Sequence, residues 1–256
     1  DAIPEVAQRL MAAHWPGPLT LVFKRRGGVA AAAAGGHPTI AVRCPAHPAA
    51  QALLQACEDL GVPGVAAPSA NRFGRVSPTT ADHVRQEFGD ALMVLDGGPC
   101  PVGIESAIVD VSRMPPTLLR PGVLSAQVLS DAAGMQVAAA QGDGQAPAAS
   151  GTLAAHYAPR AKVRLMSPVM LKDALGVLGA DGIPGLAVYA RTVPVKSKRI
   201  VQRRMPAQAE PAAHELFSVL RELDDVGVNL IWVEQPPSSP EWDGVLDRLQ
   251  RAAASA

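Results

Sequence analysis

The stretch Pro68–Pro78 reads PSANRFGRVSP and decides how the first half of this chain is interpreted. It places hydroxyl, amide and guanidinium side chains between a small apolar run, Gly64–Pro68, and a helical pattern, Thr79–Phe88. The run predicts a buried strand, while Asp82 in the first helical turn and Gly89 after the last turn predict the helix ends. Free backbone N–H groups at a helix N-terminus favour phosphate or carboxylate. The stretch is therefore a candidate anion-binding loop, and an ordinary capped loop is the alternative.

Neighbouring segments are predicted to be strands, and two of them end in an arginine. Thr39–Arg43 reads TIAVR and precedes a proline-containing break before a predicted helix, Ala49–Leu60. Thr117–Arg120 reads TLLR, and Ser106–Val111 is a further strand that follows the turn GGPCPVGIE. The arginines and the serine-bearing turns can converge on one edge of a sheet. Taken singly, they are equally compatible with ordinary strand residues and surface ion pairs.

Length and composition permit two domains. The chain has 256 residues, of which 48% are hydrophobic and 18% charged, so it can bury substantial cores. The stretch 126–150 carries only Asp131 and Asp143 as charges, is rich in alanine, glycine and glutamine, and is predicted to be a linker. We therefore expect a first domain over about residues 1–130, a linker over 131–160 and a second domain over 161–256.

In the second domain, predicted strands alternate with predicted helices. In chain order they are strand Lys162–Met166, helix Pro168–Leu178, strand Gly185–Ala190, helix Ala207–Leu223, strand Asn229–Val233 and helix Trp242–Ala252. This alternation predicts a small open α/β sheet with helical crossovers. The segment contains no glycine-rich phosphate-binding fingerprint.

Composition also argues against several classes of protein. The three cysteines, Cys44, Cys57 and Cys100, are not spaced as metal ligands are, and their odd number argues against a disulfide framework. Cys57 is expected on the buried apolar face of a helix. The formal net charge is zero, so there is no global nucleic-acid footprint, and the basic run Lys196–Arg204 is expected to be a solvated edge or a weak RNA contact. The sequence shows neither an apolar run of membrane-spanning length nor a signal-peptide pattern, which predicts a cytoplasmic protein without membrane contact.

Four segments in the order TIAVRCPAHP, APSANRFGRVSPTTADHV, GIESAIVDV and LLRPG resemble the YrdC-like family of threonylcarbamoyl-AMP synthases. WPGPLTLVF at Trp15–Phe23 is similar to the same family. SGTLAAHYAP at Ser150–Pro159 resembles the linker of its long form, and LRELDDVGVNLIWV and DRLQRAA resemble its extra C-terminal domain. The resemblance covers nearly the whole chain. It implies an α/β fold: a YrdC-like twisted mixed sheet with helices, followed by a smaller Rossmann-like α/β domain.

The resemblance also implies a reaction, in which L-threonine, bicarbonate and ATP, with Mg²⁺, form threonylcarbamoyl-adenylate and pyrophosphate. The threonine amine captures bicarbonate as a carbamate, whose oxygen attacks the α-phosphorus of ATP. A downstream transferase complex then passes the threonylcarbamoyl group to tRNA. No protein nucleophile is needed, so we expect no catalytic side chain and no protein-bound metal. Placement of the reactants and charge neutralisation would drive the reaction.

Individual ligand-binding positions follow from the same resemblance. Threonine would be held by the Arg43 guanidinium, which can meet a carboxylate with two parallel hydrogen bonds, and by the Ala67 backbone and the Ser106 hydroxyl. The residues expected to line the ATP side are Thr39, Ser69, Asn71, Ser77, Arg120 and Tyr157. Tyr157 lies in HYAP, which is expected to cover the cleft as a lid, and a tyrosine packed between domains is the alternative.

The sequence departs from the family in two places. Ala107 stands where the family often has threonine, which puts a role for that position in doubt. The family also has several tens of residues before WPGPLTLV, with a threonine-site segment and a phosphate-gripping lysine–arginine pair, whereas this sequence begins at Asp1. We therefore expect an N-terminally truncated catalytic domain, and a divergent inactive homologue is the alternative.

Two other classes of function remain compatible with these residues. An RNA-binding module would use Arg43, Arg72, Arg75 and Arg120 without chemistry, and its binding would depend steeply on salt. A carbamoyltransferase would use carbamoyl phosphate, as related YrdC-like domains do within larger proteins. The C-terminal domain and the lack of zinc-finger cysteine pairs argue against this second class.

Overall fold

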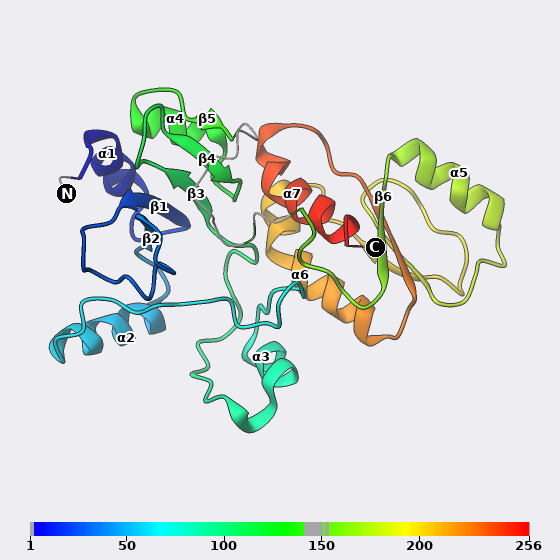
Figure 1. Cartoon of the computed structure of the whole chain (residues 1–256). Coiled ribbons are helices and arrows are strands. Elements are labelled where there is room, and N and C mark those ends of the chain that lie inside the picture. The colour runs from blue at the N-terminus through cyan, green and yellow to red at the C-terminus, as the bar shows by residue number, and fades with distance from the viewer. Residues whose placement is uncertain (1–2, 141–150, 152–153, 256) are drawn as a thin grey trace. The chain divides into compact units, whose positions relative to one another are not determined.

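The computed structural model describes residues 3–140, 151 and 154–255, which fold as two compact units (Figure 1). Unit 1 comprises Asp1–Ser69 and Glu105–Thr152, and unit 2 comprises Ala70–Ile104 and Leu153–Ala256. Unit 2 therefore takes in a segment from the middle of the predicted first domain. Much of the predicted linker, residues 141–150 and 152–153, lies outside the described residues. The division of the sequence at residues 130 and 160 stays a prediction.

Unit 1 is built around a five-stranded mixed sheet. In spatial order its strands are β2 (Thr39–Arg43), β1 (Leu19–Lys24), β3 (Ala107–Asp110), β4 (Thr117–Arg120) and β5 (Ala138–Ala139). β1 pairs antiparallel with β2 and parallel with β3, and β3 pairs antiparallel with β4. The predicted strands at β2, β3 and β4 are thus confirmed. Because β2 runs against β1, the end of β2 lies beside the start of β1, and this positions the candidate site.

Two helices, α1 (Glu5–His14) and α4 (Ala126–Ala133), cover one face of this sheet (Figure 1). Their apolar side chains recur at helical spacing, as in Val6 and Leu10 of α1, and pack on alternate residues of the strands. The other members of this core are Ala7, Leu19, Leu21, Ala107, Val109, Val111, Leu129, Ala133 and Val137. α4 occupies part of the stretch predicted to be a linker, so that prediction was wrong there. The few apolar residues of α4, with Leu129 and Ala133 buried, are enough to bury one face of this helix.

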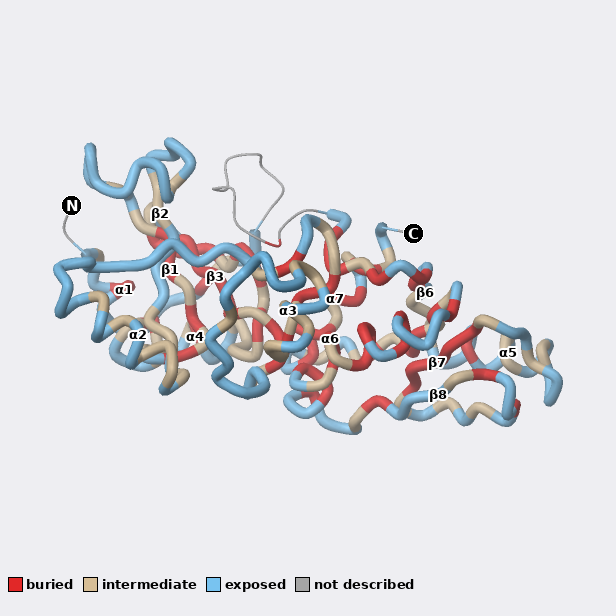
Figure 2. Tube along the Cα trace, turned by 90° about the horizontal axis from the view of Figure 1, so that it is seen from below, coloured by how far each residue is buried: buried red, intermediate tan, exposed pale blue. Residues whose placement is uncertain are grey.

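Helix α2 (Pro48–Asp59) contributes no buried residue, as the tan and pale blue tube of Figure 2 shows. The predicted helix is confirmed, and the His47 side chain caps it by accepting a hydrogen bond from Ala49 N. The prediction that Cys57 lies in a core is wrong, because its side chain is only partly buried and Leu53 is 48% exposed. An apolar stripe predicts which face of a helix can be buried, and a neighbouring element is still needed to bury it.

The predicted strand at Gly64–Pro68 is absent, since these residues belong to no sheet. They are exposed, and the Val65 side chain is 51% exposed. A strand exists through hydrogen bonds to a neighbouring strand. The small apolar composition of this run does not by itself supply such a neighbour.

Unit 2 contains a parallel sheet in the order β6 (Lys162–Met166), β9 (Leu230–Glu234), β7 (Leu186–Ala190) and β8 (Val201–Arg204). Three of these strands were predicted, and β8 was not, because its polar sequence VQRR lacks an apolar pattern. Parallel strands joined by helices confirm the predicted small Rossmann-like sheet. The exposed strand β8 lies at the edge of the sheet.

Helix α5 (Pro168–Leu178) connects β6 to β7, helix α6 (Ala209–Asp225) connects β8 to β9, and helix α7 (Asp243–Ala253) follows β9; all three helices were predicted. β7 is buried along its whole length, because Leu186 and Val188 pack with Leu171 of α5 on one face. On its other face the Tyr189 hydroxyl donates to Glu215 of α6 over 2.8 Å, and burial raises the pKa of this tyrosine. β7 is therefore held between α5 on one face of the sheet and α6 on the other.

The segment 70–104 of unit 2 carries α3 (Ala81–Phe88), as predicted, followed by the short helix η1 (Gly89–Ala91). Thr80 caps α3 by accepting a hydrogen bond from His83 N, and Gly89 follows its last residue with a positive φ. A second short helix, η2 (Pro240–Trp242), precedes α7. Among residues 3–140, 151 and 154–255, no helix has the length and apolarity needed to cross a membrane.

Candidate functional site

Four polar side chains lie in a row across one edge of the unit 1 sheet, where β2 and β4 end and β1 and β3 begin. They are Arg43, Thr20, Ser106 and Arg120, here called the sheet-edge row. Arg43 stands opposite Thr20 in the β1–β2 register. The Thr20 and Ser106 hydroxyl oxygens are 2.7 Å apart, and Arg120 Nη2 donates to the Ser106 hydroxyl over 3.5 Å. The strand order thus brings together side chains that are far apart in the sequence.

The predicted convergence of Arg43, Ser106 and Arg120 on one sheet edge is confirmed, while their roles toward ligands stay predictions. Sequence reasoning missed Thr20, which lies in WPGPLTLVF and had no assigned role. Its signal was available: a hydroxyl residue at the start of an apolar strand. Thr20 matters because its hydroxyl is the nearest hydrogen-bonding partner of the Ser106 hydroxyl in this row.

Arg120 is anchored close to Ser106. Its Nε and Nη2 donate to the Ser106 carbonyl oxygen over 3.2 and 3.0 Å, and both residues are buried. A buried guanidinium keeps its positive charge, because its pKa is far above neutral. Arg120 therefore places a fixed positive charge near the hydroxyls of Ser106 and Thr20. This arrangement suits a phosphate or carboxylate group.

Arg43 is oriented by a backbone contact. Its Nε donates to the Gly17 carbonyl oxygen over 3.0 Å, and Gly17 N in turn donates to the Cys44 carbonyl oxygen over 2.8 Å. The residue as a whole is exposed. The planar guanidinium of an arginine matches the geometry of a carboxylate.

The structure does not bring the other unit 1 predictions to this row. Thr39 lies at the opposite end of β2, where it pairs with Lys24. Ala67 and Ser69 lie in the exposed segment that forms no strand. Their proposed contacts with ATP and threonine stay predictions.

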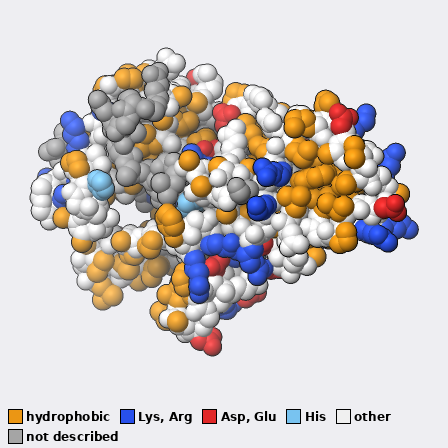
Figure 3. All heavy atoms as spheres, turned by 45° about the vertical axis from the view of Figure 1, so that its right-hand side comes forward, with side chains coloured by type: hydrophobic (Ala, Val, Ile, Leu, Met, Phe, Trp, Pro, Cys, Tyr) orange, Lys and Arg blue, Asp and Glu red, His pale blue; other side chains and the backbone are white. Residues whose placement is uncertain are grey.

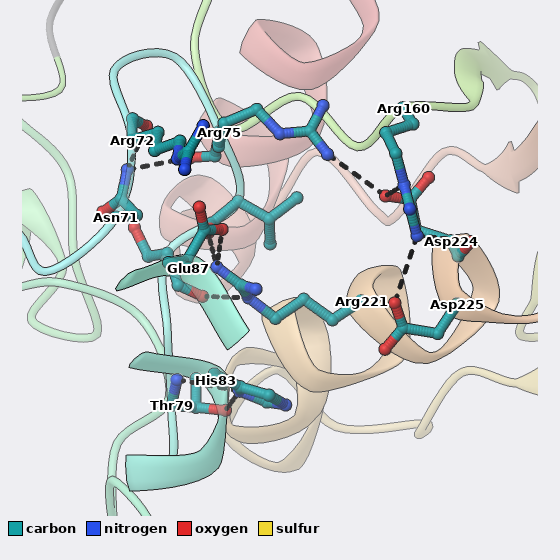
Figure 4. Close-up of polar contacts among 12 residues, drawn as sticks. Asn71, Arg72, Arg75, Thr79, His83, Glu87, Arg160, Arg221, Asp224 and Asp225 are labelled. Carbon is teal, nitrogen blue, oxygen red and sulfur yellow. Dashed lines mark hydrogen bonds and ion pairs between the residues drawn. The ribbon is translucent and has the colours of Figure 1, made fainter. Parts of the chain in front are cut away.

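Residues 71–77 of unit 2 form a loop, here called the 71–77 loop, whose backbone is hydrogen-bonded by the Asn71 side chain (Figure 4). Asn71 Nδ2 donates to the carbonyl oxygens of Arg72 and Arg75 over 2.9 and 3.2 Å. Asn71 is 8% exposed, and its Oδ1 has no hydrogen-bond partner among the described residues. A buried acceptor without a partner is costly, so this oxygen is suited to a donor group on a ligand. Ser77, at the end of the loop, is also buried.

Helix α3 begins shortly after this loop, and His83 closes its first turn. His83 Nδ1 accepts a hydrogen bond from Thr79 N over 3.2 Å, which requires that nitrogen to be unprotonated. Burial, followed by the positive charge of Arg221, lowers the pKa of His83, against the smaller raising effect of Asp225 and Asp82. The neutral imidazole is therefore the form that fits this turn at neutral pH.

Tyr157 of the HYAP motif is buried, with 1% of the residue exposed. Its ring centroid lies 5.2 Å from that of Phe217 on α6, and the Arg248 guanidinium of α7 lies 5.6 Å from the ring. The next residue, Ala158, donates through its backbone N to the Gly74 carbonyl oxygen over 2.8 Å. Tyr157 thus packs against residues of its own unit, unit 2. A contact between Tyr157 and ATP stays a prediction.

Of the arginines that an RNA-binding module would use, Arg75 already pairs with an acidic side chain within unit 2. Arg75 and Arg160 both bind the Asp224 carboxylate, at 3.3 and 3.0 Å, and Arg203 of β8 pairs with Glu222. Figure 3 shows Lys and Arg side chains in separate groups with acidic side chains among them. The remaining basic residues near β8 are exposed, which fits the predicted solvated edge, because charged edge strands discourage pairing with other chains.

The described part of the chain contains no group of three or more His, Cys, Asp or Glu side chains that could hold a metal ion. The structure describes all three cysteines, and none of them forms a disulfide bond. The sheet-edge row supplies hydroxyl and guanidinium groups, which bind phosphate or carboxylate oxygens rather than cations. Fold and site together define a two-unit α/β protein with a candidate anion-binding site at one edge of the unit 1 sheet.

Comparison with known proteins identifies the family. Residues 1–122 match the Sua5–YciO–YrdC family model, described as "Telomere recombination". Residues 122–254 match the model described as "Threonylcarbamoyl-AMP synthase, C-terminal domain". The chain belongs to the threonylcarbamoyl-AMP synthase family.

Individual relatives agree with this assignment. The threonylcarbamoyl-AMP synthase of Pyrococcus abyssi is 32% identical over 271 residues, which cover 98% of this chain and 74% of the relative. That of Bacillus subtilis is 34% identical over 266 residues, which cover 98% of this chain and 73% of the relative. A crystal structure of P. abyssi Sua5 complexed with L-threonine matches with a TM-score of 0.84 at 30% identity, covering all of this chain and 76% of that one. The expected fold of both parts is confirmed.

Proposed function

We propose that this protein joins L-threonine, bicarbonate and ATP into threonylcarbamoyl-AMP and pyrophosphate. The observation that carries the proposal is the sheet-edge row, in which Arg43 and Arg120 flank the hydroxyls of Thr20 and Ser106 in a member of this family. Threonine carries negative charge on its carboxylate, and ATP carries it on its phosphates. Arginine is the side chain that best matches both groups.

The chemistry has two steps whose atoms balance. The threonine amine attacks bicarbonate and forms an N–C bond, and one water leaves, which gives a carbamate. A carbamate oxygen then attacks the α-phosphorus of ATP, so a new P–O bond forms as the bond to pyrophosphate breaks. The protein holds the reactants in line and offsets the developing negative charge.

Each predicted residue has a task in this proposal. Arg43 grips the threonine carboxylate, and Ser106 and the Ala67 backbone complete the threonine side. On the ATP side, Arg120 faces phosphate oxygens and the Asn71 Oδ1 accepts from a donor on the nucleotide. Thr39, Ser69, Ser77 and Tyr157 are the remaining proposed ATP contacts. Mg²⁺ would arrive with the triphosphate as part of the substrate, where it would neutralise phosphate charge.

The product would leave for a further protein. A mixed anhydride of a carbamate and AMP is a reactive carbamoyl donor, so a transferase must accept it and pass the group to tRNA. We place this work in the cytoplasm, because the proposed product serves tRNA modification. A weak RNA contact at the basic run Lys196–Arg204 belongs to the same proposal.

The test is threonine-dependent release of pyrophosphate in the presence of bicarbonate, Mg²⁺ and ATP. We expect release to stop when either threonine or bicarbonate is omitted. Release that continues without threonine would contradict the proposal, and would point to ordinary ATP hydrolysis or to another acceptor.

A further inference from the structure

Arg221 of helix α6 contacts the end of the 71–77 loop (Figure 4). Arg221 Nε donates to the Ser77 carbonyl oxygen over 3.3 Å, and its Nη2 donates to the Val76 carbonyl oxygen. The same Nη2 is 2.9 Å from Glu87 Oε1 on α3. The side chains of Arg221 and Glu87 are 10% and 12% exposed. A single nearly buried guanidinium therefore joins the end of the loop to the helix that follows it.

A carboxylate one turn further along α6 holds the loop from another side. Asp224 Oδ2 accepts from Arg75 Nη2 at 3.3 Å and from Arg160 Nε at 3.0 Å, while Oδ1 accepts from the Ala161 backbone N at 2.9 Å. The Asp224 side chain is 8% exposed. This buried charge is matched by two arginines and an amide, so it fixes the Arg75 side chain relative to the start of β6.

The backbone of α6 also lies against the segment that leads to Ser106. Gly103 has a φ of +86°, and a Cβ atom there would lie 2.2 Å from the His214 carbonyl oxygen and 2.4 Å from that of Ala213. Only a residue without a side chain permits this approach. α6 thus contacts the segment 70–104 at both of its ends.

We propose that α6 is the element that positions the ATP-binding loop, with Arg221 as its positioning residue. This rests on the proposed function, in which Asn71 and Ser77 contact ATP. Ordering a loop costs backbone entropy, and hydrogen bonds from a buried cation to its carbonyls offset that cost before the ligand arrives. The C-terminal part of the chain then contributes to ATP affinity through the loop, without touching the nucleotide.

The test separates positioning from the stability of the ion pair. Glu87→Gln removes the carboxylate but leaves Arg221 bonded to both loop carbonyls. Arg221→Met with Glu87→Gln removes those bonds and leaves no unpaired buried charge. The matched control is Arg203→Met, which breaks the exposed pair between β8 and Glu222 of the same helix. Readouts are the dissociation constants of ATP and threonine by calorimetry, and hydrogen exchange of residues 71–79.

We expect the double variant to weaken ATP binding about tenfold and to speed exchange across the loop, because it loses hydrogen bonds from a charged donor. Threonine affinity should change less than about twofold, and Glu87→Gln and Arg203→Met should leave ATP affinity within about twofold of the parent, since neither breaks a bond to the loop. Equal ATP affinity in Glu87→Gln and the double variant would overturn the proposal.

If the double variant does not fold, Arg221→Lys is the variant that tests the proposal. A lysine retains the charge opposite Glu87 but is a point charge that cannot serve two carbonyls and a carboxylate with one planar fork. It should therefore fold, weaken ATP and speed loop exchange, and parent-like values would contradict the proposal. Because loop exchange needs no turnover, a failure of the proposed reaction in the parent protein would not be mistaken for failure of this inference.

Discussion

The sheet-edge row and the 71–77 loop are both candidate ligand-binding regions, but contacts of different kinds hold them. The row is fixed by strand pairing and by side chains on neighbouring strands, such as Ser106 and Arg120, which are 14 residues apart. The loop depends on Arg221 and Asp224, which are 144 and 149 residues from their partners Ser77 and Arg75. The first region is part of a sheet, whereas the second needs a distant helix. Disturbing α6 should therefore affect the loop and spare the row.

The largest expected effect comes from Gly103→Ala. The new Cβ would meet the α6 backbone at 2.2 Å, and backbone cannot rotate away as a side chain can. We expect a loss of about 3 kcal/mol or more in the free energy of unfolding, from overpacking and left-handed strain together. Thermal or chemical denaturation measures it.

The control is Gly98→Ala in the same segment. Gly98 also has a positive φ, of +83°, but its Cβ would meet nothing within 4 Å. It should cost only the strain, about 1–2 kcal/mol. Equal losses for the two variants would mean that the contact with α6 has no energetic weight.

The next effect concerns the row, where two arginines are proposed to serve different ligands. Arg43→Ala should weaken threonine binding by about tenfold or more and leave ATP largely unchanged, because a charged hydrogen-bonding pair is lost. Arg120→Ala should weaken ATP more than threonine. Titration calorimetry with each ligand measures both. Equal losses of both ligands in both variants would contradict the assignment.

The same two substitutions test whether the sheet-edge row and the 71–77 loop are held independently. Arg43 and Arg120 donate to the carbonyl oxygens of Gly17 and Ser106 in unit 1, whereas the 71–77 loop belongs to unit 2. Hydrogen exchange of residues 71–79 should therefore match the parent protein in both variants without ligand. Faster loop exchange in Arg43→Ala would show that the regions are not held separately.

The smallest expected effect is on the titration of His83. Burial, then Arg221, lowers its pKa below the usual 6.5. The unfolded chain therefore binds the proton more readily, so stability falls as the pH drops below about 6.5 toward the folded pKa. Arg221→Met with Glu87→Gln should raise the pKa of His83, and NMR titration of its ring protons measures this. Arg203→Met should leave it unchanged, and a shift of equal size there would contradict the assigned cause.

Much of the fold could be predicted from local patterns. Alternating strands and helices predicted β6, α5, β7, α6, β9 and α7, because each carries an apolar period bounded by turn residues. The strand prediction for Gly64–Pro68 was wrong because an apolar run does not reveal whether a pairing strand exists. β8 was missed for the opposite reason, since an exposed edge strand needs no apolar face.

The candidate site was predictable only in part. Arg43, Ser106 and Arg120 were found because they end or begin strands, where side chains from different strands meet. Arg221 and Asp224 gave no such signal, because charged residues on an amphipathic helix usually lie on its solvated face. Only the packing of α6 against the segment 70–104 shows that these two charges are buried.

In the proposed reaction, this protein builds a carbamoyl bridge between threonine and AMP. Incubation with ¹³C-bicarbonate, L-threonine, Mg²⁺ and ATP, followed at once by mass spectrometry, tests it most directly. We predict an adenylate that contains threonine and one ¹³C atom in its carbamoyl carbon, and much less of it with Arg43→Ala. Consumption of ATP that yields only AMP or ADP, without a labelled adenylate, would contradict the account.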